Sequence, residues 1–158
     1  YGGGAGCPAG YNTSLPSLFN ITDFSNGTVA LSSHVYDGMY STYVYGDEAE
    51  RIIRRESAQT DHPFFLYVAA QSIHTPLEAP QVYMDMYPNA PGAANHSDAQ
   101  VIHAMVTALD DMVGVIYNAL KTTDVWDNTL IIFTADNGGD THGNNFPLRA
   151  GKFTTWEG

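Results

Sequence analysis

Two segments of the chain repeat apolar residues at the spacing of an amphipathic helix. Residues 41–57 combine an apolar side with a polar face rich in Glu and Arg, and Thr42 is expected to cap this helix. A longer segment begins after Ser97, which suits an N-cap, and reaches about Thr122. Its apolar positions recur every three or four residues, at Val101, Met105, Ala108, Leu109, Met112, Val113, Ile116 and Leu120. The pattern predicts two helices that each turn one face to a core.

Two continuous apolar runs, at residues 64–70 and 130–134, have the length of β-strands. Such runs are typical of strands buried on both faces, as in a parallel sheet under helices. Residues 75–96 hold four prolines and are expected to form a long loop. Residues 1–40 show no sustained periodicity and are predicted irregular, apart from a short strand near 28–31. The order helix, strand, loop, helix, strand predicts an α/β fold with a mostly parallel sheet.

The chain is strongly acidic, with 17 Asp and Glu against 6 Lys and Arg and a net charge of -11. This balance argues against nucleic acid and against anionic membrane surfaces, which both require clustered basic residues. No apolar run approaches the roughly 20 residues that a membrane span needs. A bound divalent cation would let so acidic a protein hold an anionic substrate, so the charge is compatible with a metal site.

The single cysteine, Cys7, cannot form a disulfide within the chain. A structural role or a disulfide to sequence elsewhere is favoured over catalysis, because no His or helix start accompanies it. Asn-x-Ser/Thr glycosylation motifs occur at Asn12, Asn20, Asn26 and Asn95. They predict residence in the secretory pathway, either outside the cell or in the lysosome. A start at Tyr1 without Met and an end directly after a patterned segment indicate a piece of a longer chain.

Polar residues follow both apolar runs, where open α/β sheets bind their ligands. Asp136 and Asn137, followed by two glycines, offer hard oxygen ligands that suit Ca²⁺ or Mg²⁺. The alternative is a plain turn, for which Asp, Asn and Gly are also favoured. His74 is a candidate to donate a hydrogen bond or a proton to an anion, and the alternative is a structural or solvated histidine.

Two of the six basic residues, Arg149 and Lys152, lie close together in a glycine-containing loop near the end of the chain. Such a pair can hold an oxyanion. The alternative is an ordinary solvated loop.

Three segments together resemble the sulfatase family, and in particular its arylsulfatase B type. They read Pro-Phe-Phe-Leu-Tyr-Val-Ala-Ala-Gln-Ser-Ile-His over residues 63–74, Thr-Ala-Asp-Asn-Gly-Gly over 134–139, and Asn-Asn-Phe-Pro-Leu-Arg-Ala-Gly-Lys over 144–152. The resemblance implies an alkaline-phosphatase-like α/β sandwich. Residues 1–158 would form part of one sulfatase catalytic domain, with 1–40 irregular and 41–158 supplying the α/β portion.

The resemblance also implies roles for single residues. Asp136 and Asn137 would be two ligands of Ca²⁺, with Mg²⁺ as the alternative ion. His74 and Lys152 would contact the sulfate group and the bridging oxygen of a sulfate ester or sulfated glycan. Ala150 stands where the family usually has glycine.

The family's nucleophile, a formylglycine made within Cys/Ser-x-Pro-x-Arg, has no counterpart in this sequence. It is expected upstream of Tyr1, so the chain alone is predicted to lack sulfatase activity. One alternative function is a non-catalytic extracellular or matrix protein that binds sulfated polysaccharide. A phosphodiesterase or phosphonate hydrolase is a further alternative, against which the Pro-Leu-Arg-x-x-Lys sequence argues. None of these patterns predicts the oligomeric state.

Overall fold

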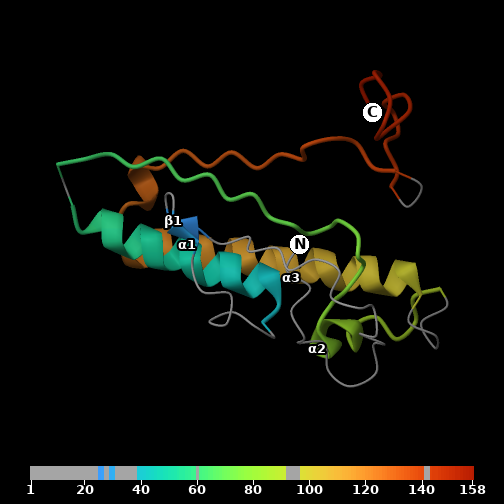
Figure 1. Cartoon of the computed structure of the whole chain (residues 1–158), viewed down its shortest axis with the longest axis horizontal. Coiled ribbons are helices and arrows are strands. Elements are labelled where there is room, and N and C mark those ends of the chain that lie inside the picture. The colour runs from blue at the N-terminus through green and yellow to red at the C-terminus, as the bar shows by residue number, and fades with distance from the viewer. Residues whose placement is uncertain (1–24, 27–28, 31–38, 60, 92–96, 141–142) are drawn as a thin grey trace. The chain divides into compact units, whose positions relative to one another are not determined.

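Helices form most of the regular structure in the computed structural model of the chain (Figure 1). The structure describes residues 25–26, 29–30, 39–59, 61–91, 97–140 and 143–158. In chain order its elements are β1 (Ser25–Asn26), β2 (Val29–Ala30), α1 (Ser41–Ser57), α2 (Gln81–Met84), α3 (Asp98–Thr122) and the 3-10 helix η3 (Trp126–Asn128). The chain divides into two units, Tyr1–Asp127 and Asn128–Gly158, and each is described by itself.

The longest element, α3, follows the prediction closely. Ser97 is its N-cap, and the Ser97 hydroxyl accepts a hydrogen bond from the backbone N–H of Gln100 at 3.3 Å. The buried residues of α3 include Val101, Met105 and Leu120, which belong to the predicted apolar stripe. By length and composition α3 could also cross a membrane, a test that core helices of soluble proteins pass as well. In the structure α1 and α2 pack against α3, as a core helix requires (Figure 1). Of the predicted stripe, Val113 is exposed.

Helix α1 has the predicted bounds, but the prediction of its cap is wrong. Tyr40 is the N-cap, and no side chain caps the helix. Thr42 lies inside the first turn with only 2% of its surface exposed, and its hydroxyl is 2.9 Å from the hydroxyl of Ser72. The Thr42 side chain therefore points inward and links the helix to the loop at Ser72. It does not accept a hydrogen bond from the backbone N–H groups at the start of the helix.

The core of the first unit consists of two apolar clusters along α3. One cluster joins α2 to the first half of α3 and contains Ala79, Tyr83, Met84, Val101, Ala104, Met105 and Ala108. The other joins Ile53 of α1 to Ala119 and Leu120 of α3. Helix α2 lies within the segment predicted as a loop, and its Tyr83 hydroxyl donates a hydrogen bond to Asp111 Oδ2 at 2.7 Å. This four-residue helix was too short for the periodicity to reveal.

The first predicted strand, residues 64–70, is extended and alternates between covered and exposed side chains. Phe64 and Leu66 pack against the second cluster, whereas Phe65 and Tyr67 are 91% and 78% exposed. This alternation is that of a strand with helices on one face. The backbone is nevertheless assigned to no strand, because a strand ladder requires a neighbouring strand to receive its N–H and C=O groups.

The second predicted strand, residues 130–134, is likewise extended and unassigned, and its side chains are exposed. The predicted parallel sheet is therefore not shown by the described part of the chain. A small antiparallel pair does occur, with Ser25 opposite Ala30 and Asn26 opposite Val29. The strand predicted near 28–31 is thus confirmed at Val29–Ala30. Three glycosylation candidates (Asn12, Asn20 and Asn95) and Cys7 lie outside the described residues.

Candidate functional site

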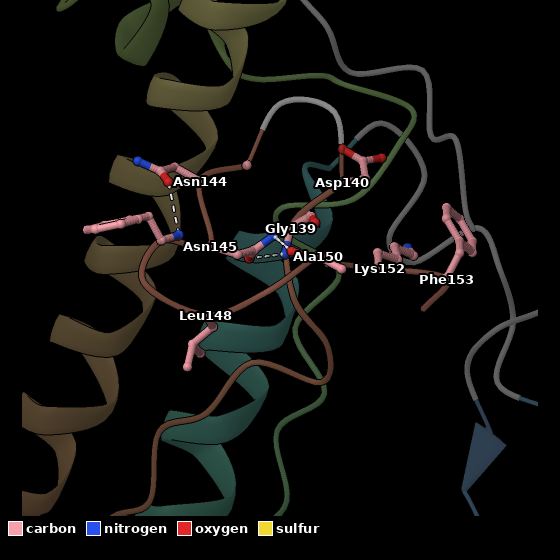
Figure 2. Close-up of a pocket in the computed structure, with 11 residues that line it drawn as sticks. Gly139, Asp140, Asn144, Asn145, Leu148, Ala150, Lys152 and Phe153 are labelled. Atoms are coloured by element: carbon pink, nitrogen blue, oxygen red, sulfur yellow. Dashed lines mark hydrogen bonds between the residues drawn. The ribbon is translucent and has the colours of Figure 1, made fainter. Parts of the chain in front are cut away.

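The second unit is organised around the side chain of Asn145 (Figure 2). Its Oδ1 accepts a hydrogen bond from the backbone N–H of Gly139 at 2.9 Å. Its Nδ2 donates to the carbonyl of Gly139 at 2.9 Å and to the carbonyl of Ala150 at 3.0 Å. One amide group thus holds together the turn that follows Asp136 and Asn137 and the loop that leads to Lys152.

Lys152 joins the same network through its backbone. Its N–H donates to the carbonyl of Gly139 at 3.1 Å, so this carbonyl accepts from both Lys152 and Asn145. Residues of the two loops line a cavity of about 490 Å³ that is open to solvent. Asp140, Lys152 and Phe153 are among the lining residues. Lys152 is half-buried at its wall and makes no ion pair with another described residue. Its ammonium lies 5.4 Å from the centre of the Phe153 ring.

Arg149, the other basic residue of this loop, pairs with a carboxylate of the same loop. Its guanidinium donates to both carboxylate oxygens of Glu157, from Nε at 2.8 Å and from Nη2 at 3.1 Å. It also lies 4.1 Å from the centre of the Trp156 ring. The Arg149 charge is thus balanced by Glu157 within the loop, and the holding of an oxyanion by Arg149 and Lys152 stays a prediction.

Close backbone approaches explain why glycine occupies key positions of this unit. A Cβ atom at Gly151 would lie 2.2 Å from the carbonyl oxygen of Gly139 and 2.5 Å from Nδ2 of Asn145. No side chain fits there without breaking the network. Ala150 has φ of 59°, in the left-handed region that glycine adopts at lower cost.

Asp136 and Asn137 end the extended segment and are exposed. Their side chains make no hydrogen bond or ion pair with other residues that the structure describes. One carboxylate and one amide oxygen at adjacent positions fit a hard divalent cation, which takes six or more oxygen ligands. In the described ranges no three His, Cys, Asp or Glu side chains gather into such a site, so the pair can supply only part of the ligands.

His74 belongs to the first unit, where it follows the extended segment as expected. The side chain is exposed, and Nδ1 lies 2.8 Å from the carbonyl oxygen of Thr75. The hydroxyl of Thr75 lies 3.5 Å from the same nitrogen.

The structure thus brings three of the four predicted site residues into the second unit: Asp136, Asn137 and Lys152. His74 is placed only within the first unit. The sequence interpretation missed Asn145 and Glu157, which organise the loop. Two adjacent asparagines, Asn144 and Asn145, are the only sequence feature that indicates side-chain hydrogen bonding in this loop. The sequence does not show which of the two bonds to backbone groups of another segment.

Comparison with known proteins identifies the family. The sulfatase family model matches residues 7–158. Arylsulfatase J of Mus musculus is 37% identical over 151 residues, which cover 94% of this chain and 24% of that protein. N-acetylgalactosamine-6-sulfatase of Homo sapiens is 34% identical over 123 residues, which cover 74% of this chain and 21% of that protein. The chain therefore belongs to the sulfatase family.

A solved structure agrees with this assignment. The crystal structure of Ps i-CgsB in complex with k-i-k-neocarrahexaose is similar with a TM-score of 0.68 and 41% sequence identity. The match covers 77% of this chain and 26% of that one. The chain thus spans about a quarter of the length of the relatives that it matches.

Proposed function

We propose that the complete natural protein containing these residues hydrolyses sulfate esters, and that this chain supplies part of its metal and sulfate site. Membership of the sulfatase family supports the reaction class. The observation that carries the proposal is the hydrogen bond from the Lys152 N–H to the Gly139 carbonyl, at 3.1 Å. It ties the cavity's lysine to the turn that immediately follows Asp136 and Asn137.

Lys152 would bind the sulfate group through its ammonium. Its charge is not neutralised by a described carboxylate, and the half-buried position lowers the effective dielectric around it. A fixed positive charge beside the sulfate oxygens stabilises the negative charge that the transition state places there. Asp136 and Asn137 would hold Ca²⁺, or Mg²⁺ as the alternative, and the bound ion would supply further positive charge for the same oxygens.

His74 would assist the departing alcohol. Its imidazole is exposed directly after the extended segment, and such a ring can give a hydrogen bond or a proton to the bridging oxygen. The proposed fold is an alkaline-phosphatase-like α/β sandwich formed by a single catalytic domain. The exposed face of residues 64–70 supports it, because Phe65 and Tyr67 are apolar side chains that a neighbouring layer would cover.

The substrate we propose is a sulfated glycan, with a simple aryl sulfate as the alternative. One relative is named for N-acetylgalactosamine 6-sulfate chemistry, and one similar structure holds an oligosaccharide. A glycan presents sulfate on a flexible, exposed polymer, which suits an open cavity. We further propose that the protein is glycosylated at Asn12, Asn20, Asn26 and Asn95 and resides in the secretory pathway, in the lysosome or outside the cell.

A peptide map of the complete natural protein, combined with a sulfate-release assay, tests the proposal. We expect a formylglycine-containing Cys/Ser-x-Pro-x-Arg peptide and release of sulfate from an aryl sulfate or a sulfated glycan. The 158 residues alone are expected to release none. A complete protein that lacks formylglycine and releases no sulfate, yet retains sulfated polysaccharide on a column, would overturn the proposal in favour of the matrix-binding alternative.

A further inference from the structure

Among the described residues of the second unit, Asn145 is the one whose side chain bonds to the backbone of two separate segments that line the cavity. It satisfies the N–H and the C=O of Gly139 and also the C=O of Ala150. Its neighbour Asn144 makes only a local bond, in which Oδ1 accepts from the Phe146 N–H at 3.0 Å. Figure 2 shows the Asn145 amide lying between Gly139 and Ala150.

The bonds connect two functional segments. Gly139 follows Asp136 and Asn137 by three and two residues, and Ala150 precedes Lys152 by two. The Lys152 N–H donates to the same Gly139 carbonyl that Asn145 holds, so this carbonyl is fixed from two directions. The two segments are in tight contact, because a Cβ atom at Gly151 would lie 2.2 Å from the Gly139 carbonyl oxygen.

We propose that Asn145 is a positioning residue that sets the distance between Lys152 and the Asp136–Asn137 turn. This inference rests on the proposed function, because it assumes that both segments act on one sulfate group. Displacing a binding group by about 1 Å can lower a rate by about a hundredfold. Nδ2 of Asn145 donates to the carbonyls of Gly139 and Ala150, so the residue would act through the backbone that it holds.

An amide side chain is required at position 145 because it accepts one hydrogen bond, from the Gly139 N–H, and donates two, to the carbonyls of Gly139 and Ala150. Aspartate in its charged form keeps the bond from the Gly139 N–H but turns an acceptor toward two carbonyl oxygens. Protonation restores one donor, and the adjacent carbonyls favour the protonated form. The charged side chains among the residues that line the cavity are Asp140 and Lys152. Arg149 and Glu157 neutralise each other in the same loop.

The test compares Asn145→Ala, Asn145→Asp and Asn118→Ala in the complete natural protein. Asn118 is an exposed residue of α3 far along the sequence from the cavity loops, so its variant should keep parental activity. We expect Asn145→Ala to lower kcat/KM for sulfate release by about ten- to a hundredfold. We expect the loss in Asn145→Asp to shrink as the pH is lowered from about 7 to about 5, a recovery that general unfolding would not produce.

Amide hydrogen exchange provides a readout that does not depend on activity. In Asn145→Ala the N–H groups of Gly139 and Lys152 should lose protection, while those of α3 keep theirs. If the parent protein releases no sulfate, the proposed function fails but the exchange rates still decide the role of Asn145. Parental exchange at Gly139 and Lys152 in Asn145→Ala, or a loss in Asn145→Asp that is the same at every pH, would overturn the inference.

Discussion

Arg149 and Glu157 form two parallel hydrogen bonds within the loop that carries Lys152, at 2.8 and 3.1 Å. The backbone supports the same closure, because the Gly158 N–H donates to the Arg149 carbonyl at 2.8 Å. With the Trp156 ring beside the guanidinium, the segment from Arg149 to Gly158 is tied into a loop. The arginine therefore shapes this loop, and the lysine is left to face the cavity.

Acid is expected to open this ion pair. The hydrogen bond from Arg149 holds the pKa of Glu157 below its usual value of 4.5. Because the pKa is lowered in the folded state, the pair stabilises the loop above the unfolded pKa, and this contribution is lost as the pH falls through the folded one. The fluorescence of Trp156, which the guanidinium covers, should therefore change with a midpoint below pH 4.5.

Two variants make this titration decisive. Trp156→Phe should abolish the transition and thereby separate it from any signal of Trp126. Glu157→Gln should remove the titrating group and leave the fluorescence flat over the same range. A transition that survives Glu157→Gln would show that some other group controls the loop.

Replacing Ala150 with glycine is expected to stabilise the second unit. The residue has φ of 59°, where a Cβ costs roughly 1–2 kcal/mol, and part of that gain is offset by the greater freedom of glycine when unfolded. Urea unfolding should give a net increase of about 0.5–1 kcal/mol. Ala135→Gly, in the extended segment, is the control and should lower stability. Equal effects of the two changes would argue against strain at Ala150.

The packing of α1 on α3 depends on a glycine. A Cβ at Gly46 would lie 3.1 Å from Cγ of Met112, whereas nothing lies within 4 Å of a Cβ at Gly114. Gly46→Leu should therefore push the helices apart and destabilise the chain by about 1–3 kcal/mol. Gly114→Leu should be stabilising by up to about 0.8 kcal/mol, through helix propensity alone. Thermal unfolding of the two variants measures their changes in stability. Destabilisation by both, or stabilisation by both, would contradict the packing described.

The helices could be predicted from the sequence because their signals are local. Ser97 and the stripe that begins at Val101 specify the start and the buried face of α3 within a few turns. The cap of α1 was mispredicted because Thr42 found a partner thirty residues away, in Ser72. The strand that contains Phe65 and Tyr67 stays a prediction for a related reason: a strand is defined by a neighbouring strand, which the described residues do not provide.

The candidate site was only partly visible in the sequence. Asp136, Asn137 and Lys152 could be predicted because their polar groups occur within segments that resemble the sulfatase family. Asn145 was not, because its role depends on three backbone groups that meet only after the loops have folded. The engagement of Arg149 by Glu157, eight residues later, likewise required the structure.

The two lysines of the sequence, Lys121 and Lys152, offer the most direct test of the central claim. Sulfate release by the complete natural protein should be measured for Lys152→Ala and Lys121→Ala side by side. Lys121 lies in the last turn of α3, with its ammonium 5.1 Å from the Trp126 ring, and its loss should leave turnover unchanged. Loss of Lys152 should lower kcat/KM by about a hundredfold or more, because a fixed charge on the sulfate is removed. Parental turnover in Lys152→Ala would contradict the assignment of this loop to a sulfate site.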